Sequence, residues 1–64
     1  MTHYVTQVVQ GYKIEVSSNR EHVAITTPSG GLIDCLRRGT HQPLASLPKR
    51  VKAEISKMTG WVIS

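Results

Sequence analysis

Within residues 12–27, two segments alternate between apolar and polar side chains with a period of two, and this pattern constrains the fold most. Successive side chains of a β-strand point to opposite faces, so the alternation predicts two half-buried strands, at 12–17 and 22–27. A polar cluster rich in Ser and Asn separates them and favours a turn. The two strands therefore form a predicted hairpin. Its apolar positions are Tyr12, Ile14 and Val16 in the first strand and Val23 and Ile25 in the second.

Further strands are predicted on both sides of this hairpin. Residues 4–9 are rich in β-branched and aromatic types, and Gln10–Gly11 supplies a turn or a bulge after them. Residues 28–31, Pro-Ser-Gly-Gly, predict a tight connection. Residues 32–37 fit a fourth strand or a short helix, because periodicity cannot decide so short a run. We favour the strand.

Residues 48–59 carry the clearest helical pattern. Pro in the first turn wastes no hydrogen-bond donor, and Gly60 suits a left-handed cap at the C-terminal end. Pro43 predicts an irregular loop over 39–46. After the helix, Trp61 and its neighbours either fold back over the core or add a short strand. The apolar stripe of the helix consists of Leu47, Val51, Ile55 and Met58.

These elements predict an α+β fold: a small antiparallel three- to four-stranded β-meander with one C-terminal α-helix packed on one face. The 64 residues form one domain, 1–64, which buries only about 60% of its unfolded surface. The predicted strand 4–9 has apolar residues on both faces, and one helix covers only one face. A homodimer that covers the second face is the economical answer.

The single cysteine, Cys35, excludes an intrachain disulfide and indicates a reducing compartment. The first ten residues do not resemble a signal peptide, and the apolar runs fall far short of the roughly 20 residues that cross a membrane. The chain is therefore predicted to be cytoplasmic, with no membrane partner.

Positive charge gathers in the second half of the chain. Between Leu36 and Ala53 there are five cations and no acid, and the formal net charge of the chain is +4. Such a cluster predicts contacts to nucleic-acid phosphates. The alternatives are a solvated helix face, partly paired with Glu54, or a surface for an acidic protein. The candidate binding residues are Arg37, Arg38, Lys49, Arg50, Lys52 and Lys57.

Neither a metal site nor an active site is predicted. Cys35 and the histidines His3, His22 and His41 show no metal-ligand spacing. Asp34 lies beside Cys35, but in a strand it points to the opposite face. So short a chain also has little room for a pocket that excludes water. We therefore expect no enzyme, no metal and no cofactor.

The sequence thus predicts a small non-enzymatic accessory or regulatory protein that binds nucleic acid through its basic C-terminal half. The alternative is a small inhibitor or adaptor, of the kind that phage and mobile elements encode, which docks on an acidic host surface or adds to a sheet edge. A structural subunit of an assembly is a third interpretation. Trp61 either packs on the core or serves as an exposed anchor for a protein partner.

Overall fold

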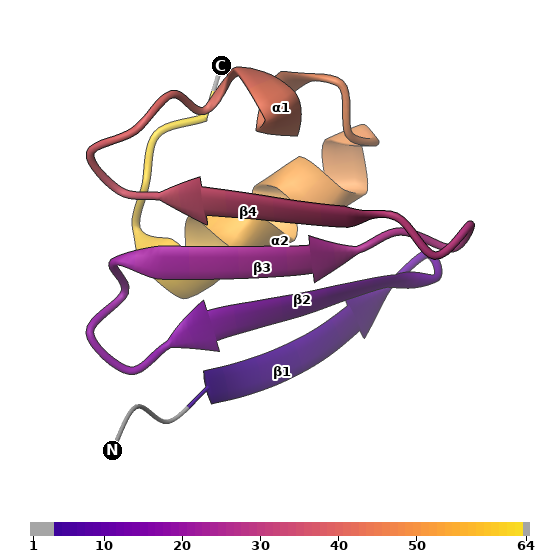
Figure 1. Cartoon of the computed structure of the whole chain (residues 1–64), viewed down its shortest axis with the longest axis horizontal. Helices are drawn as coiled ribbons and strands as arrows, with labels where there is room; N and C mark the ends of the chain where they lie inside the picture. The colour runs from indigo at the N-terminus through magenta and orange to yellow at the C-terminus, as the bar shows by residue number, and fades with distance from the viewer. Residues whose placement is uncertain (1–3, 64) are drawn as a thin grey trace.

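The computed structural model describes residues 4–63 and contains one antiparallel sheet with two helices after it (Figure 1). The four strands lie in the sheet in their sequence order, β1-β2-β3-β4. The predicted α+β class, a β-meander followed by a C-terminal helix on the sheet, is confirmed. The elements are β1 (Tyr4–Val9), β2 (Tyr12–Ser17), β3 (His22–Thr26), β4 (Leu32–Leu36), α1 (Gln42–Ala45) and α2 (Lys49–Thr59).

Tight turns fix the register of the meander. Gln10 and Gly11 both have positive φ, 51° and 82°, as a two-residue hairpin turn of the primed type requires. The segment 32–36 is a strand, because Val23 pairs with Cys35 and Ile25 with Ile33. The alternative helix in this segment was therefore wrong.

The loop predicted over 39–46 is also wrong in part, since it contains the short helix α1. Pro43 lies in the first turn of α1, where a backbone N–H has no partner within the helix, so proline costs nothing there. Burial of Leu44 gives this turn its packing. Helix α2 ends as predicted: Gly60 has φ 77°, and its N–H donates to the carbonyl of Ser56.

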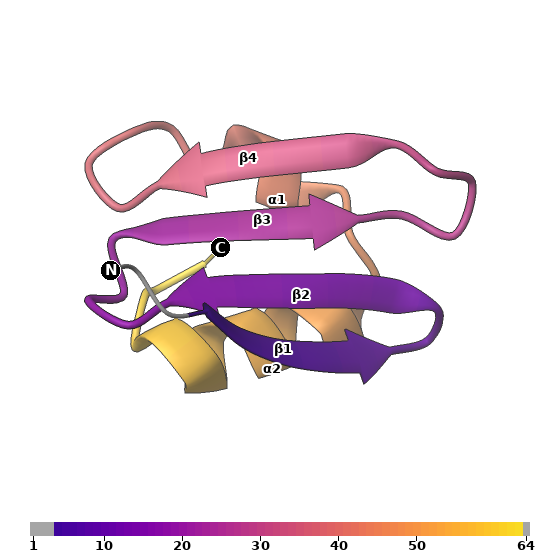
Figure 2. The ribbon, with the colours of Figure 1, turned by 60° about the horizontal axis from the view of Figure 1, so that its bottom comes forward.

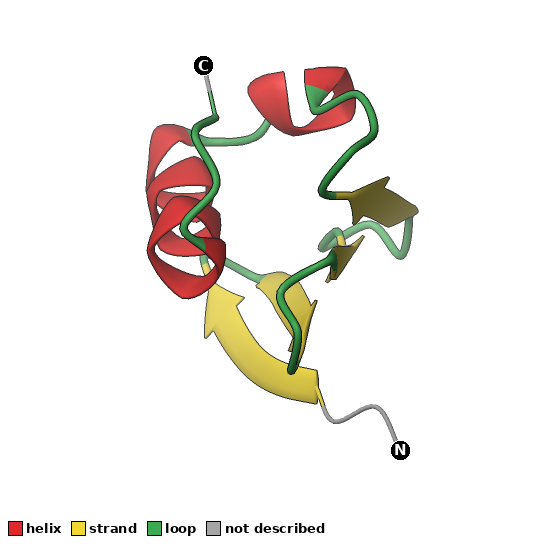
Figure 3. Ribbon diagram, turned by 90° about the vertical axis from the view of Figure 1, so that its left-hand side faces the viewer, coloured by secondary structure: helices red, strands yellow, loops and turns green. Residues whose placement is uncertain are grey.

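The core lies between one face of the sheet and the two helices. In Figure 2, α2 lies behind the β1–β2 half of the sheet and α1 behind the other half. Figure 3 shows both helices on the same side of the curved sheet. Trp61 and Ile63 fold back over this core and form no strand. The buried apolar residues are Ile14, Val16, Val23, Ile25, Cys35, Leu44, Leu47, Val51, Ile55 and Trp61.

Within residues 4–63, no helix lies on the second face of the sheet, here called the open face. Strand register places polar side chains in its centre, on β2, β3 and β4. Its exposed apolar side chains lie on the two edge strands: Tyr4, Val8, Leu32 and Leu36. The expectation of apolar residues on both faces of residues 4–9 holds, but the face as a whole is mixed. None of the helices within residues 4–63 has the length and apolar character needed to cross a membrane.

Candidate nucleic-acid interface

The outer face of α2 carries four cations. Burial of Val51, Ile55 and Thr59 turns one side of the helix to the sheet, and the 3.6-residue period leaves the charged positions outside. The four cations form what we call the α2 group: Lys49, Arg50, Lys52 and Lys57.

The α2 group keeps its charge available for a ligand. No member forms an ion pair within residues 4–63, so the partial pairing with Glu54 that the alternative interpretation included is not seen in this region. The Lys52 Nζ donates a hydrogen bond to the carbonyl oxygen of Ala45, over 3.4 Å. Lys49 and Lys52 also border a shallow hollow of about 290 Å³ beside Ile63. Lys57 lies in the last helical turn, where a cation also stabilises the helix dipole.

The other two predicted cations lie elsewhere. Arg37 and Arg38, here called the loop pair, follow β4 in the loop that leads to α1. This loop lies at the end of the molecule where α2 finishes, whereas the first turn of α2 lies at the opposite end (Figure 1). Arg37 pairs with Glu21 at 3.7 Å, and its backbone N–H donates to the Glu21 carbonyl. The loop pair is therefore separated from the cations in the first turn of α2, Lys49, Arg50 and Lys52, whereas Lys57 in the last turn lies at the same end of the molecule as the pair.

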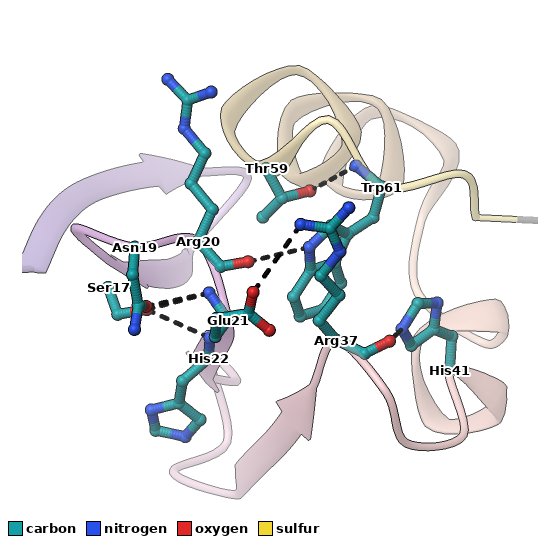
Figure 4. Close-up of polar contacts among 9 residues, drawn as sticks. All are labelled: Ser17, Asn19, Arg20, Glu21, His22, Arg37, His41, Thr59 and Trp61. Carbon is teal, nitrogen blue, oxygen red and sulfur yellow. Dashed lines mark hydrogen bonds and ion pairs between the residues drawn. The ribbon is translucent and has the colours of Figure 1, made fainter.

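Trp61 lies at the corner that joins the chain end to the sheet (Figure 4). Its indole Nε1–H donates to the carbonyl of Arg20 at 3.0 Å, and its ring stacks on His41 with centroids 4.8 Å apart. The residue is 5% exposed. Trp61 is thus a core residue, and the alternative of an exposed partner anchor does not fit this structure.

Arg20 is a further cation, outside the six predicted binding residues. It occupies the left-handed region, with φ 59°, in the turn between β2 and β3. Non-glycine residues rarely adopt this conformation. Its side chain borders a hollow of about 400 Å³, together with Val5, Val16 and Met58. No spacing rule could have found it, because α2 and β1 reach this turn only in the folded chain.

On the open face, two side-chain hydrogen bonds link residues of β1, β3 and β4. His22 Nδ1 lies 2.8 Å from the Tyr4 hydroxyl, and His22 Nε2 lies 2.9 Å from Asp34 Oδ1. A carboxylate only accepts, so the ring Nε2–H donates to Asp34 Oδ1. Asp34 is largely exposed, which leaves this hydrogen bond open to water. These two hydrogen bonds connect the edge strands β1 and β4 to β3.

Neither Cys35 nor the histidines assemble a metal site within the described region. No cluster of three His, Cys, Asp or Glu side chains occurs among residues 4–63. His3 lies outside the described residues. Cys35 is buried, and burial, with a smaller effect of the Asp34 charge, raises the pKa of its thiol. A neutral buried thiol is a poor metal ligand and a poor nucleophile.

The two faces of the molecule differ in charge. Helix α2 has four cations and one acid, a net +3, whereas the open face has Lys13, Glu15 and Asp34, a net −1 with His22 neutral. Comparison of the chain with protein-family models, curated proteins and solved structures found no match. The charge difference favours the approach of a polyanion to the helix face.

Proposed function

We propose that this chain is a small, non-enzymatic accessory or regulatory protein of the cytoplasm that binds nucleic acid through the α2 group and acts as a homodimer. The observation that supports it is the charge of α2: four cations without an ion pair in residues 4–63, on the face opposite an acidic sheet surface. No cofactor or metal has a part in this function.

The α2 group suits contacts to phosphates rather than to bases. Three of its members are lysines, whose compact ammonium groups bind phosphate as point charges. Lys52 gives one N–H to Ala45 and keeps two for a ligand. Phosphate contacts fix the position of a protein on nucleic acid without reading its sequence. We therefore expect binding with little sequence preference. Arg38 adds a further phosphate contact, separate from those of the α2 group.

Fluorescence anisotropy with labelled single- and double-stranded DNA and RNA, at several salt concentrations, tests this function. On duplex DNA each phosphate contact contributes about 0.9 to the slope of log affinity against log salt, so the four contacts of one α2 group contribute about −3.6. Between 50 and 200 mM salt, these four contacts alone should lower the affinity by a factor of roughly 150.

Alanine variants show which residues produce the salt dependence of the affinity. Replacing all four members of the α2 group should abolish binding, and each single replacement should reduce the slope by about 0.9. Lys13→Ala is the matched control, because Lys13 is an exposed cation on the open face. A fourfold variant that is folded by circular dichroism and binds like the wild type would contradict the proposal.

The second candidate function is that of a protein inhibitor or adaptor, and the exposed apolar residues of the open face favour it. Tyr4, Val8, Leu32 and Leu36 expose large apolar side chains, which a protein partner could bury. If nucleic acid does not bind, affinity capture from host lysate becomes the test. Loss of one captured protein in Leu36→Asp, but not in the fourfold α2 variant, would support docking through this face.

A further inference from the structure

Strand β1 is an edge strand without the usual protection. Its six residues, Tyr-Val-Thr-Gln-Val-Val, include no charge, no proline and no glycine. Val5 and Val8 are 63% and 64% exposed, although they lie on opposite faces of the sheet. Natural proteins blunt such edges with charges, prolines, bulges or a covering segment, because an open edge pairs with other strands. Nothing in residues 4–63 covers this edge along its length.

The opposite edge, β4, is protected by charge. Asp34 stands in the middle of β4 and faces the open side of the sheet. In a symmetric antiparallel pairing centred on this strand, Asp34 would stand opposite its own copy, and like charges in that position repel. The two edges therefore differ, and β1 is the one suited to pair with itself.

We propose that β1 pairs antiparallel with β1 of a second copy, about a two-fold axis at Thr6, and that the two sheets become one of eight strands. Opposed residues in an antiparallel pair share a face, so a symmetric pairing must be centred on a residue. Centring on Thr6 sets Tyr4 opposite the partner's Val8 and Thr6 opposite its own counterpart. Aromatic with β-branched pairs and Thr with Thr pairs are favourable. Centring on Gln7 would set Tyr4 opposite the partner's Gln10, which lies in the turn beyond the strand.

The two-fold axis also fixes how the two α2 helices are related. Met58 borders the hollow beside Val5 of β1, so the side of α2 that carries Met58 faces the β1 edge. The axis would set the two α2 helices antiparallel, on the same side of the joined sheet.

The dimer also bears on the binding of polyanions. Two α2 groups on one side of a continuous sheet double the number of cations that a single strand or duplex can contact. Two linked sites bind a long ligand more tightly than either alone, without any new contact. This inference rests on the homodimer of the proposed function, but it joins the two copies through the β1 edge and leaves the open face uncovered. It does not depend on the ligand, so it is tested without nucleic acid.

Sedimentation equilibrium of the purified protein tests the pairing. We expect a reversible monomer–dimer equilibrium at micromolar concentrations. Thr6→Lys places two like charges opposite each other and should raise the dissociation constant by roughly tenfold. Leu32→Lys makes a similar change on the exposed edge of β4 and should leave the constant unchanged. Circular dichroism of both variants shows whether they are folded.

Cysteine cross-linking tests the register. Opposed Cα atoms in an antiparallel pair are about 4.5–5.5 Å apart, within the range of a disulfide. Oxidised Thr6→Cys should therefore form a covalent dimer, whereas Gln7→Cys should not. A monomer at high micromolar concentration would overturn the proposal. So would a Thr6→Lys variant that dimerises as tightly as the wild type. A monomer that keeps the salt-dependent affinity would overturn the dimer and leave the nucleic-acid function in place.

Discussion

Replacing Trp61 by alanine should destabilise this protein more than any change on its charged surface. The substitution removes an indole that is almost fully buried, its 3.0 Å hydrogen bond to the Arg20 carbonyl and its stacking on His41. Truncation of a buried aromatic residue to alanine typically costs about 3–5 kcal/mol. At roughly 0.05–0.15 kcal/mol per residue, a chain of this length has about 3–10 kcal/mol of stability in total. The substitution should therefore remove about a third or more of the total stability, and at the lower end of that range the variant is unfolded at 25 °C.

Trp61→Phe separates packing from hydrogen bonding. A phenyl ring can still stack on His41, but it lacks the N–H that the Arg20 carbonyl accepts. An acceptor left without its donor costs about 1–3 kcal/mol, and the lower end applies here because the bond is only partly buried. For a domain of this size each kcal/mol lowers the melting temperature by about 4–8 °C.

Urea unfolding followed by far-ultraviolet circular dichroism measures both variants, because tryptophan fluorescence is lost with the residue. Val62→Ala is the matched control: Val62 is the next residue and is 89% exposed. Its stability should stay within about 0.5 kcal/mol of the wild type. An unfolding midpoint of Trp61→Ala equal to that of the wild type would refute the reasoning. The indole would then be exposed in solution and available to a partner.

Two further predictions concern buried polar groups. Ser17→Ala should lower the free energy of unfolding by about 1–3 kcal/mol, because the Ser17 hydroxyl accepts hydrogen bonds from the backbone N–H groups of Glu21 and His22. Urea unfolding measures this loss. Ser18→Ala, at an exposed position, is the control and should leave the stability unchanged. The raised pKa of Cys35 means that the folded state holds the thiol proton more tightly than the unfolded state. Stability should thus be full below the pKa of the unfolded thiol and fall as the pH rises through the folded-state pKa. Melting temperatures across alkaline pH should show this fall in the wild type and less of it in Cys35→Val; equal curves would contradict it.

Local patterns predicted most of the elements. The alternation of residues 12–27 predicted β2 and β3, and the apolar stripe with its terminal glycine predicted α2 to within a residue. These features depend on the side chains of neighbouring residues and are therefore visible in sequence. The prediction failed at α1, where Pro43 was taken to exclude a helix but occupies the first turn.

The sequence by itself determined that the chain forms a meander with a basic helix, because strand and helix periods and helix caps are local properties. Only the tertiary structure decided which residues meet. The path of the β4–α1 loop separates Arg37 and Arg38 from the start of α2, and strand register brings His22 between Tyr4 and Asp34. The return of the chain after Gly60 buries Trp61 against Arg20 and His41. These contacts join residues far apart in sequence, and no local preference specifies them.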